Sequence, residues 1–411
     1  MDTITHGIAG ALIGKAVFGG DDMFVLRPMT RGRIVTWSLM LGAIFPDSDI
    51  FRDMVSRDEL LILTWHRSIT HSLLCLPIFA LLLAALTRWL TRRFKWEAPS
   101  FAALSLIYGV GILSHILLDL VTSFGTMIWS PVQWSRPAWD VIFIIDFTLA
   151  AILLVPQVLA WVYAKREGLP ARALGSWLIF SMGAIAVYAI AQVVDAPFPV
   201  RVTIVCAVIL AAIFLLPGIR FWGVRVMRSA WNAAGLIVAI AYIALAISMH
   251  RSALERIQRF AGSQQLDAQV IGALPMPPSP WHWDGLVRTQ RGVYELPIDL
   301  EDTADRVQAA ASGSGAGEIS IEYRYYPDAP ANSYIEAAKR LPAVQTVLWF
   351  ARFPVTRFHK EGSEAIVDLS DMRFPHRRPD RPAAFTYRVR FDAAGNVLEQ
   401  GWVRDERNNK P

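Results

Sequence analysis

The sequence predicts an all-α polytopic membrane domain of about eight helices, the first two of them short, followed by a small β-rich α+β soluble domain. Of the 411 residues, 54% are hydrophobic and only 18% are charged, whereas soluble domains usually carry about a quarter charged residues. Long apolar stretches recur as far as residue 249, and alternating strand patterns appear only after residue 271.

Six apolar stretches have roughly the 20 residues that a membrane span needs, and two shorter ones precede them. In chain order the eight stretches are 4–18, 34–46, 69–87, 101–122, 141–163, 173–194, 201–217 and 229–249. We expect the first two to form short helices that the others shield. The stretches together define a transmembrane domain over residues 1–250.

The composition of the sequence becomes more polar after residue 250. Residues 251–270 are typical of a polar helix or a linker, and a Pro-rich boundary follows them. Beyond it, residues 333–351 predict a helix, and alternation predicts strands. The alternating segments are 318–326, 364–370 and 385–391, the last continuing through a turn into 397–403. We therefore expect an extracytoplasmic α+β domain over residues 271–411.

The basic residues indicate how the chain is oriented in the membrane. Residues 1–249 contain 19 Lys and Arg against 14 Asp and Glu, whereas the remainder contains 21 of each. Thirteen of the 19 lie in alternate loops, after the first, third, fifth and seventh stretches. The positive-inside rule makes these loops cytoplasmic. Both termini, and with them the C-terminal domain, are then predicted on the periplasmic side of a bacterial inner membrane. Because the charge excess marks topology, it argues against nucleic acid as a partner.

The strongest local signal for chemistry is His115-x-x-x-Asp119 in the fourth stretch. Residues four apart share one face of a helix, and an imidazole beside a carboxylate is a natural pair of metal ligands. The alternative is that Asp119 only orients a buried histidine. Ionisable groups at membrane depth nevertheless indicate function by default.

Two further polar patterns lie between the second stretch and the start of the third. The segment WHRSITHS contains His66, Arg67 and His71, of which His71 would begin a helix and Arg67 could bind an anionic group. Its alternative is an interfacial loop with an incidental histidine. The segment FPDSD contains Asp47 and Asp49, which suit either a metal ion or a plain turn.

The topology, drawn from Lys and Arg alone, places polar groups from four helices at one side of the membrane. These candidate ligands are His6, Asp47, His71, His115 and Asp119, to which we add His66. Such convergence favours a metal centre over scattered structural polar residues. Nitrogen and oxygen ligands without cysteine point to one or two zinc ions, with manganese or iron as alternatives.

A metal centre with an open position makes a nucleophile of water at neutral pH, which predicts hydrolysis of an ester, a phosphoester or an amide. Asp47 or Asp49 is expected to take the proton as general base, and Arg67 to contact the substrate. Asp146, at the start of the fifth stretch, is either a further ligand or a carboxylate that orients one. Asp140, nearby, better suits a helix-start acid that favours the helix dipole.

Four motifs in this order resemble the YdjM-like family of bacterial inner-membrane metal-dependent hydrolases. They are MDTITHGIAGALIG, GAIFPDSDIF, HRSITHSLL and GILSHILLDLVTSFGT, within roughly residues 1–150. The motif order is also similar to that of zinc-dependent phospholipase C enzymes, although their downstream His and HxxxE ligands are not apparent. The resemblance implies a membrane metallohydrolase acting on a lipid or phosphoester at the outer bilayer surface.

The alternative function is a non-enzymatic membrane scaffold or transport component whose polar cluster binds an ion. A transporter more often shows pseudo-repeats and broken helices in both halves, whereas the polar residues here concentrate in the first half. The expected partners are membrane lipids and a small-molecule or lipid substrate. The sequence indicates no particular protein partner.

Overall fold

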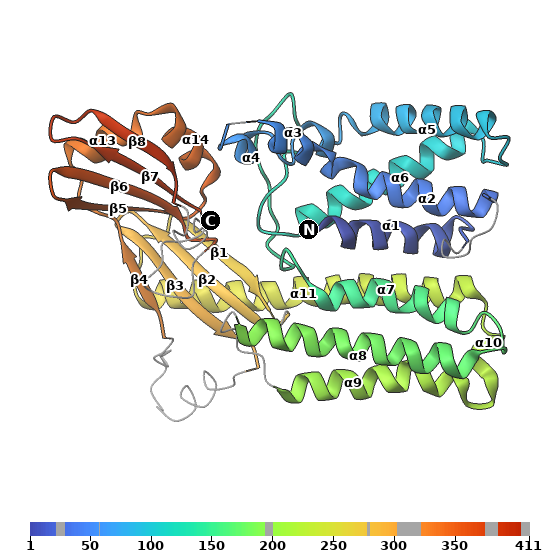
Figure 1. Cartoon of the computed structure of the whole chain (residues 1–411). Coiled ribbons are helices and arrows are strands. Elements are labelled where there is room, and N and C mark those ends of the chain that lie inside the picture. The colour runs from blue at the N-terminus through green and yellow to red at the C-terminus, as the bar shows by residue number, and fades with distance from the viewer. Residues whose placement is uncertain are drawn as a thin grey trace. The chain divides into compact units, whose positions relative to one another are not determined.

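The computed structural model describes residues 1–21, 29–56, 58–193, 200–277, 280–301, 322–374 and 385–403 (Figure 1). The chain divides into two compact units. The helical unit comprises Met1–Pro46, Cys75–Leu118 and Ile145–Ile243, and the mixed unit comprises Asp47–Leu74, Asp119–Ile144 and Ala244–Pro411. Helices α6 and α11 each contribute to both units. The N-terminal part is helical and the C-terminal part contains two antiparallel sheets, so the predicted fold class is confirmed.

Every predicted apolar stretch overlaps one long helix. In chain order these helices are α1 (Thr3–Val17), α2 (Arg31–Ile44), α5 (Leu76–Arg93), α6 (Phe101–Leu120), α7 (Phe147–Val162), α8 (Leu169–Val193), α9 (Val200–Leu215) and α11 (Arg228–Ser263). Side-chain caps begin several of them: the Asp2 carboxylate accepts the Thr5 N–H at 2.9 Å before α1. At 1.5 Å per residue, the 15 residues of α1 reach only about 22 Å. This helix is therefore short for a bilayer core of about 30 Å.

Five helical segments of the described residues are long and apolar enough to cross a membrane. They are Arg31–Arg52, Phe101–Leu120, Leu169–Gln192, Val200–Arg225 and Arg228–Ser263. A sixth would be the pair Leu61–His71 and Leu76–Arg93, which is bent by 70°. Helix α7 is apolar but shorter than these segments. The helical part is thus suited to a membrane.

Close helix contacts in the helical unit depend on glycine. A Cβ placed on Gly10 of α1 would lie 2.7 Å from the Leu39 carbonyl oxygen of α2. A Cβ on Gly111 of α6 would lie 2.8 Å from the same oxygen and 3.0 Å from the Ala43 nitrogen. Small residues let helix backbones approach in this way inside membranes. Helices α1 and α6 are therefore both pressed against α2.

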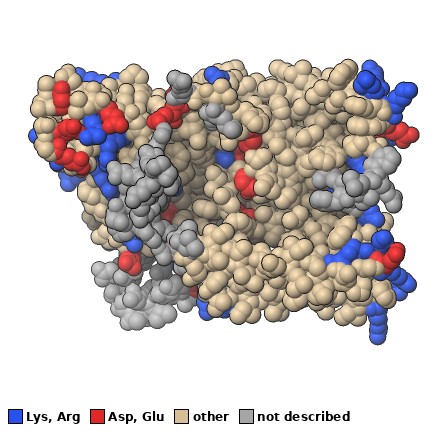
Figure 2. All heavy atoms as spheres, in the orientation of Figure 1, with Lys and Arg blue, Asp and Glu red and all other residues tan. Residues whose placement is uncertain are grey.

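The surface of the helical unit has an apolar body and a basic end. Large apolar side chains point outward along α8 and α9, such as Ile179 at 70% exposed and Val208 at 63%. Figure 2 shows Lys and Arg gathered at the end of this unit where α10 (Trp222–Arg225) lies. The loop between α5 and α6 lies at this same end (Figure 1). Apolar exposure with charge confined to the ends is the pattern of a helix bundle in lipid.

The mixed unit contains two four-stranded antiparallel sheets, each in simple sequential order. The first sheet comprises β1 (Val270–Met276), β2 (His282–Thr289), β3 (Gly292–Asp299) and β4 (Arg324–Pro327). The second comprises β5 (Pro354–Glu361), β6 (Glu364–Asp371), β7 (Thr386–Phe391) and β8 (Val397–Trp402). The expected strands at 364–370 and 385–391 are β6 and β7, and the expected final hairpin is β7–β8. Of the expected strand at 318–326, residues 318–321 lie outside the described part.

The expected helix at 333–351 is instead two helices, α13 (Ser333–Lys339) and α14 (Pro342–Phe350). Pro342 begins the second helix, because proline has no backbone N–H and disfavours a helical residue before it. Helix α11 continues past the expected boundary at residue 250 as far as Ser263. The predicted domain limits stay predictions.

Among the hydrophobic clusters of the mixed unit, two join helices to the sheets. The last turns of α11, with Ile257 and Phe260, pack on the first sheet against Trp283. The second core joins α13, α14 and the second sheet, and it also includes Leu63 and Phe124. These two residues come from the segments between the apolar stretches, 47–74 and 119–144. Those segments also contain α3 (Ile50–Val55), α4 (Leu61–Thr64) and two 3-10 turns, Phe45–Asp49 and Ile69–His71. They therefore fold onto the C-terminal sheets, and they carry several of the candidate ligands.

Candidate metal centre

Helix α6 places His115 and Asp119 one turn apart, and both side chains are completely buried. The Nδ1 atom of His115 lies 2.6 Å from the carbonyl oxygen of Ala43 on α2. A nitrogen this close to a carbonyl carries the proton, which leaves the lone pair on Nε2. Metal-binding histidines are commonly oriented by such a bond. The close contact of Gly111 with α2, one turn earlier, brings the two helices near enough for it.

The 3-10 turn Ile69–His71 positions the second histidine. The Nε2 atom of His71 lies 3.2 Å from Oδ2 of Asp119 and 3.8 Å from Oδ1 of Asp47. Its Nδ1 atom faces the other way, 3.1 Å from the Thr70 hydroxyl and 3.5 Å from Oδ2 of Asp49. One ring nitrogen therefore faces two carboxylates, and a third carboxylate lies behind the other.

Asp47, His71, His115 and Asp119 form a group that can hold a metal ion, since one ligand atom from each lies within 4.8 Å of the others. The two histidines and Asp119 are fully buried, and the Asp47 side chain is 11% exposed. Two imidazole nitrogens and two carboxylate oxygens match the preferences of zinc in proteins. The group contains four of the six ligands that the sequence predicts.

Asp49 lies at the centre of a separate hydrogen-bond network behind His71. Its carboxylate oxygens lie 3.0 Å from Nδ1 of His66, 2.9 Å from the Arg67 backbone nitrogen and 3.3 Å from the Thr70 hydroxyl. His66 is thus bonded to Asp49 and lies outside the four-residue group among the described residues. The predicted roles of Asp49 as general base and of His66 as metal ligand stay predictions.

Arg67 is buried and adopts a left-handed backbone conformation, with φ of 61°. Its guanidinium lies 3.0 Å from Oδ1 of Asp119 and donates to the Thr122 hydroxyl at 3.0 Å. Asp119 therefore has one oxygen near Arg67 and the other near His71. Arg67 balances the charge of a buried carboxylate, and its predicted contact with an anionic substrate stays a prediction.

His6 and Asp146 occupy other positions in the helical unit. The ring of His6 stacks on that of His115, with centroids 3.6 Å apart, but His6 is not in the four-residue group. Asp146 caps α7, because its carboxylate accepts the Leu149 N–H at 2.9 Å and the Tyr242 hydroxyl at 2.7 Å. The helix-start role expected of Asp140 therefore belongs to Asp146. Asp140 is instead paired with Arg352 through two hydrogen bonds of 2.8 and 3.0 Å.

Sequence reasoning missed Arg136, which holds the loops beside the group together. Its guanidinium donates to the carbonyl oxygens of Leu63, His66 at 3.3 Å and Gly125 at 3.1 Å. Burial, with the neighbouring Arg67 and Arg373, lowers the pKa of Arg136 to about 9, so it still carries its charge at neutral pH. Only its place in a loop between two apolar stretches could have drawn attention to it.

Residues 1–193 match the YdjM inner membrane protein family. This confirms the resemblance to the YdjM family that the four motifs predict, whereas the hydrolase activity and the similarity to phospholipase C stay predictions. The matched YdjM-like region contains all six predicted ligands. Helices α9 and α11 and both sheets lie outside it. No curated protein and no solved structure shows a significant match.

Proposed function

We propose that the protein is a membrane-bound metal-dependent hydrolase whose ion, zinc by preference, is held by Asp47, His71, His115 and Asp119. The buried four-residue group carries the proposal. The buried carboxylate of Asp119 and the partly buried one of Asp47 need positive charge, since a buried charge without compensation is costly. Arg67 supplies one positive charge, and a divalent ion would supply the rest.

The residues around the group suit such an ion. The hydrogen bond from His115 Nδ1 to Ala43 leaves Nε2 available as a ligand. The Thr70 hydroxyl lies 3.1 Å from Nδ1 of His71 and donates to Asp49 at 3.3 Å, so it orients the His71 ring and links it to a carboxylate. Bound at these residues, a zinc ion supplies an activated water and polarises a carbonyl or phosphoryl group.

We assign proton transfer to the Asp49–His66 pair. The Asp49 carboxylate is held by three hydrogen bonds and is almost completely buried. His66 is bonded to it through Nδ1 and has a side chain 19% exposed, so Nε2 can exchange a proton at the edge of the site. Asp47, the most exposed of the four ligands, lies where substrate can approach.

We further propose that the metal centre faces the periplasm and that the substrate is a lipid, an ester or a phosphoester at that surface. His115 and Asp119 lie in the last two turns of α6, whereas the basic loop between α5 and α6 precedes its first turn. Residues 101 and 115 are separated by about 21 Å along the helix. If the basic loops are cytoplasmic, the group lies toward the opposite face.

Metal analysis of the purified full-length protein tests the ligand assignment. We expect wild type to retain a divalent ion in stoichiometric amount, and the double variant His115→Ala with Asp119→Ala to insert but to retain almost none. His359→Ala is the matched control, because His359 is exposed and its one ion pair among the described residues is with Glu361 at 3.3 Å. Full metal content in the double variant would sink the assignment.

A screen of the same preparations against phospholipid vesicles, simple esters and phosphodiesters then tests the activity. We expect hydrolysis that is removed by a chelator and restored by zinc, and that is absent from the double variant. Bound metal without any hydrolysis would favour the second candidate, a scaffold or transport component that binds an ion. The observation that supports this second candidate is the same four-residue group.

A further inference from the structure

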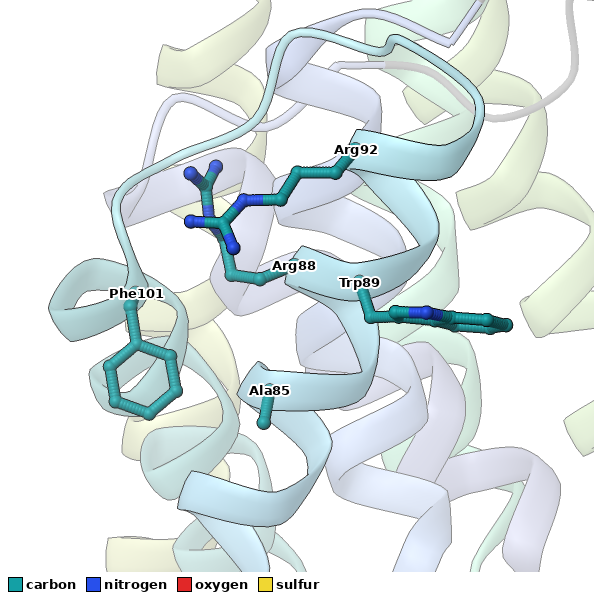
Figure 3. Close-up of a pocket in the computed structure, with 5 residues that line it drawn as sticks. All are labelled: Ala85, Arg88, Trp89, Arg92 and Phe101. Carbon is teal, nitrogen blue, oxygen red and sulfur yellow. The ribbon is translucent and has the colours of Figure 1, made fainter.

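A second polar site lies at the basic end of the helical unit, where α5 meets α6. A cavity of about 270 Å³ is lined by Ala85, Arg88, Trp89 and Arg92 of α5 and by Phe101 of α6. Figure 3 shows the two guanidinium groups side by side on one face of α5, with Phe101 beyond them and the Trp89 ring turned outward. The lining contains two cations and no carboxylate.

The two arginines are not neutralised within the described residues. The Arg88 guanidinium donates to the Pro99 carbonyl oxygen at 3.3 Å, and neither Arg88 nor Arg92 has an ion pair there. Like charges four residues apart on a helix destabilise it slightly. An anion between them would remove that cost and could accept a fork of hydrogen bonds, the geometry in which arginine binds phosphate.

The surroundings favour a lipid as the source of that anion. Ile78 and Leu81 continue the face of α5 that carries Ala85, Arg88 and Arg92, and they are 58% and 46% exposed. A ligand with a phosphate head and acyl chains can therefore contact charge and apolar surface along one helix. Trp89, 62% exposed, is of the type that lies at headgroup level.

We propose that this cavity binds the headgroup of an anionic phospholipid, such as phosphatidylglycerol, in the leaflet at the basic end of the helices. The site lies on the α5–α6 hairpin and is distinct from the candidate metal centre. It requires that the helices span a membrane, but it does not require that the protein is a hydrolase.

Native mass spectrometry of the full-length protein released from nanodiscs tests the proposal. Nanodiscs of phosphatidylcholine with a minor fraction of phosphatidylglycerol would be compared for wild type and for Arg88→Gln with Arg92→Gln. Each basic side chain near an anionic surface contributes about fivefold to lipid binding, so loss of the pair should weaken retention by about 30-fold. The matched control is Arg93→Gln with Arg225→Gln, which removes the same charge from the same end outside the cavity and should retain the lipid.

Two further arms decide the outcome. The Arg92 side chain makes no hydrogen bond to the described residues, so Arg92→Gln alone should leave the hairpin undisturbed. This single variant should still reduce lipid retention several-fold. Inorganic phosphate should not displace the lipid. Equal losses in the cavity and control pairs, or displacement by phosphate, would overturn the proposal in favour of general surface charge or of a soluble anion.

Discussion

The helical and mixed units differ in where their charged side chains lie. In the helical unit, ion pairs such as Arg228–Asp21 and Lys165–Glu167 are exposed at the basic end, and apolar side chains face outward along the helices. In the mixed unit, Arg67 and Arg373 are buried, and Arg373 is bonded to Asp371 at 2.7 Å with both side chains 2% exposed. The first arrangement suits a lipid solvent. The second fixes loops in place at some cost in desolvation.

The loops fixed in this way carry ligands of the candidate metal centre. The segments 47–74 and 119–144 belong to the mixed unit, although they lie between apolar stretches in sequence. Phe124 packs against Phe350 with ring centroids 5.2 Å apart, and Arg373 donates to the Ser123 carbonyl at 2.9 Å. The comparison teaches that the C-terminal sheets, outside the YdjM-like region, hold the loops that follow Asp119.

The largest expected effect comes from breaking that support. Phe350→Ala should cost about 4 kcal/mol, because large-to-small changes of buried aromatic residues leave a cavity. The ring is 4% exposed and lies against Phe124, five residues after Asp119. We therefore expect a lower unfolding temperature together with reduced metal retention. Trp349→Ala, at a neighbouring position that is 46% exposed, is the control and should change both by little. Normal metal retention in a destabilised Phe350→Ala protein would show that the metal centre does not depend on this packing.

An intermediate effect is expected from the helical unit. Gly111→Ala should cost about 1–3 kcal/mol, the usual penalty for overpacking. The added Cβ would lie 2.8 Å from a backbone oxygen of α2 and force α6 away from it. The bond from His115 to the Ala43 carbonyl should weaken with this shift, and metal affinity should fall.

Gly109→Ala is the matched control for this change. Of the described residues, a Cβ at Gly109 would meet only side-chain carbons of Leu76 and Ala80, at 3.8 and 3.9 Å. It should therefore leave the packing and the metal content unchanged. Equal behaviour of the two variants would show that the close approach of α2 and α6 does not position His115.

The sequence predicts those parts of the molecule that depend on local pattern. Long apolar runs mark the helices, and the spacing of His115 and Asp119 places them on one face of α6 whatever surrounds it. Asp140 and Asp146 show what local pattern does not predict. Both precede the same helix, and only the backbone of the folded chain decides that Asp146 caps it. The support that Phe350 and Arg373 give to the loops joins residues more than 200 positions apart. No local pattern encodes such contacts.

The smallest effect is expected at the ion pair between Asp140 and Arg352. Arg352→Gln should cost about 1 kcal/mol, because the arginine is 28% exposed and water can replace part of the interaction. Raising the salt concentration should narrow the difference from wild type, since screening weakens the pair that the variant lacks. Arg357→Gln, an exposed position on β5 in the same unit, is the control. An equal loss of stability in Arg352→Gln and Phe350→Ala would contradict this order of effects. It would show that this ion pair holds the loops as firmly as apolar packing does.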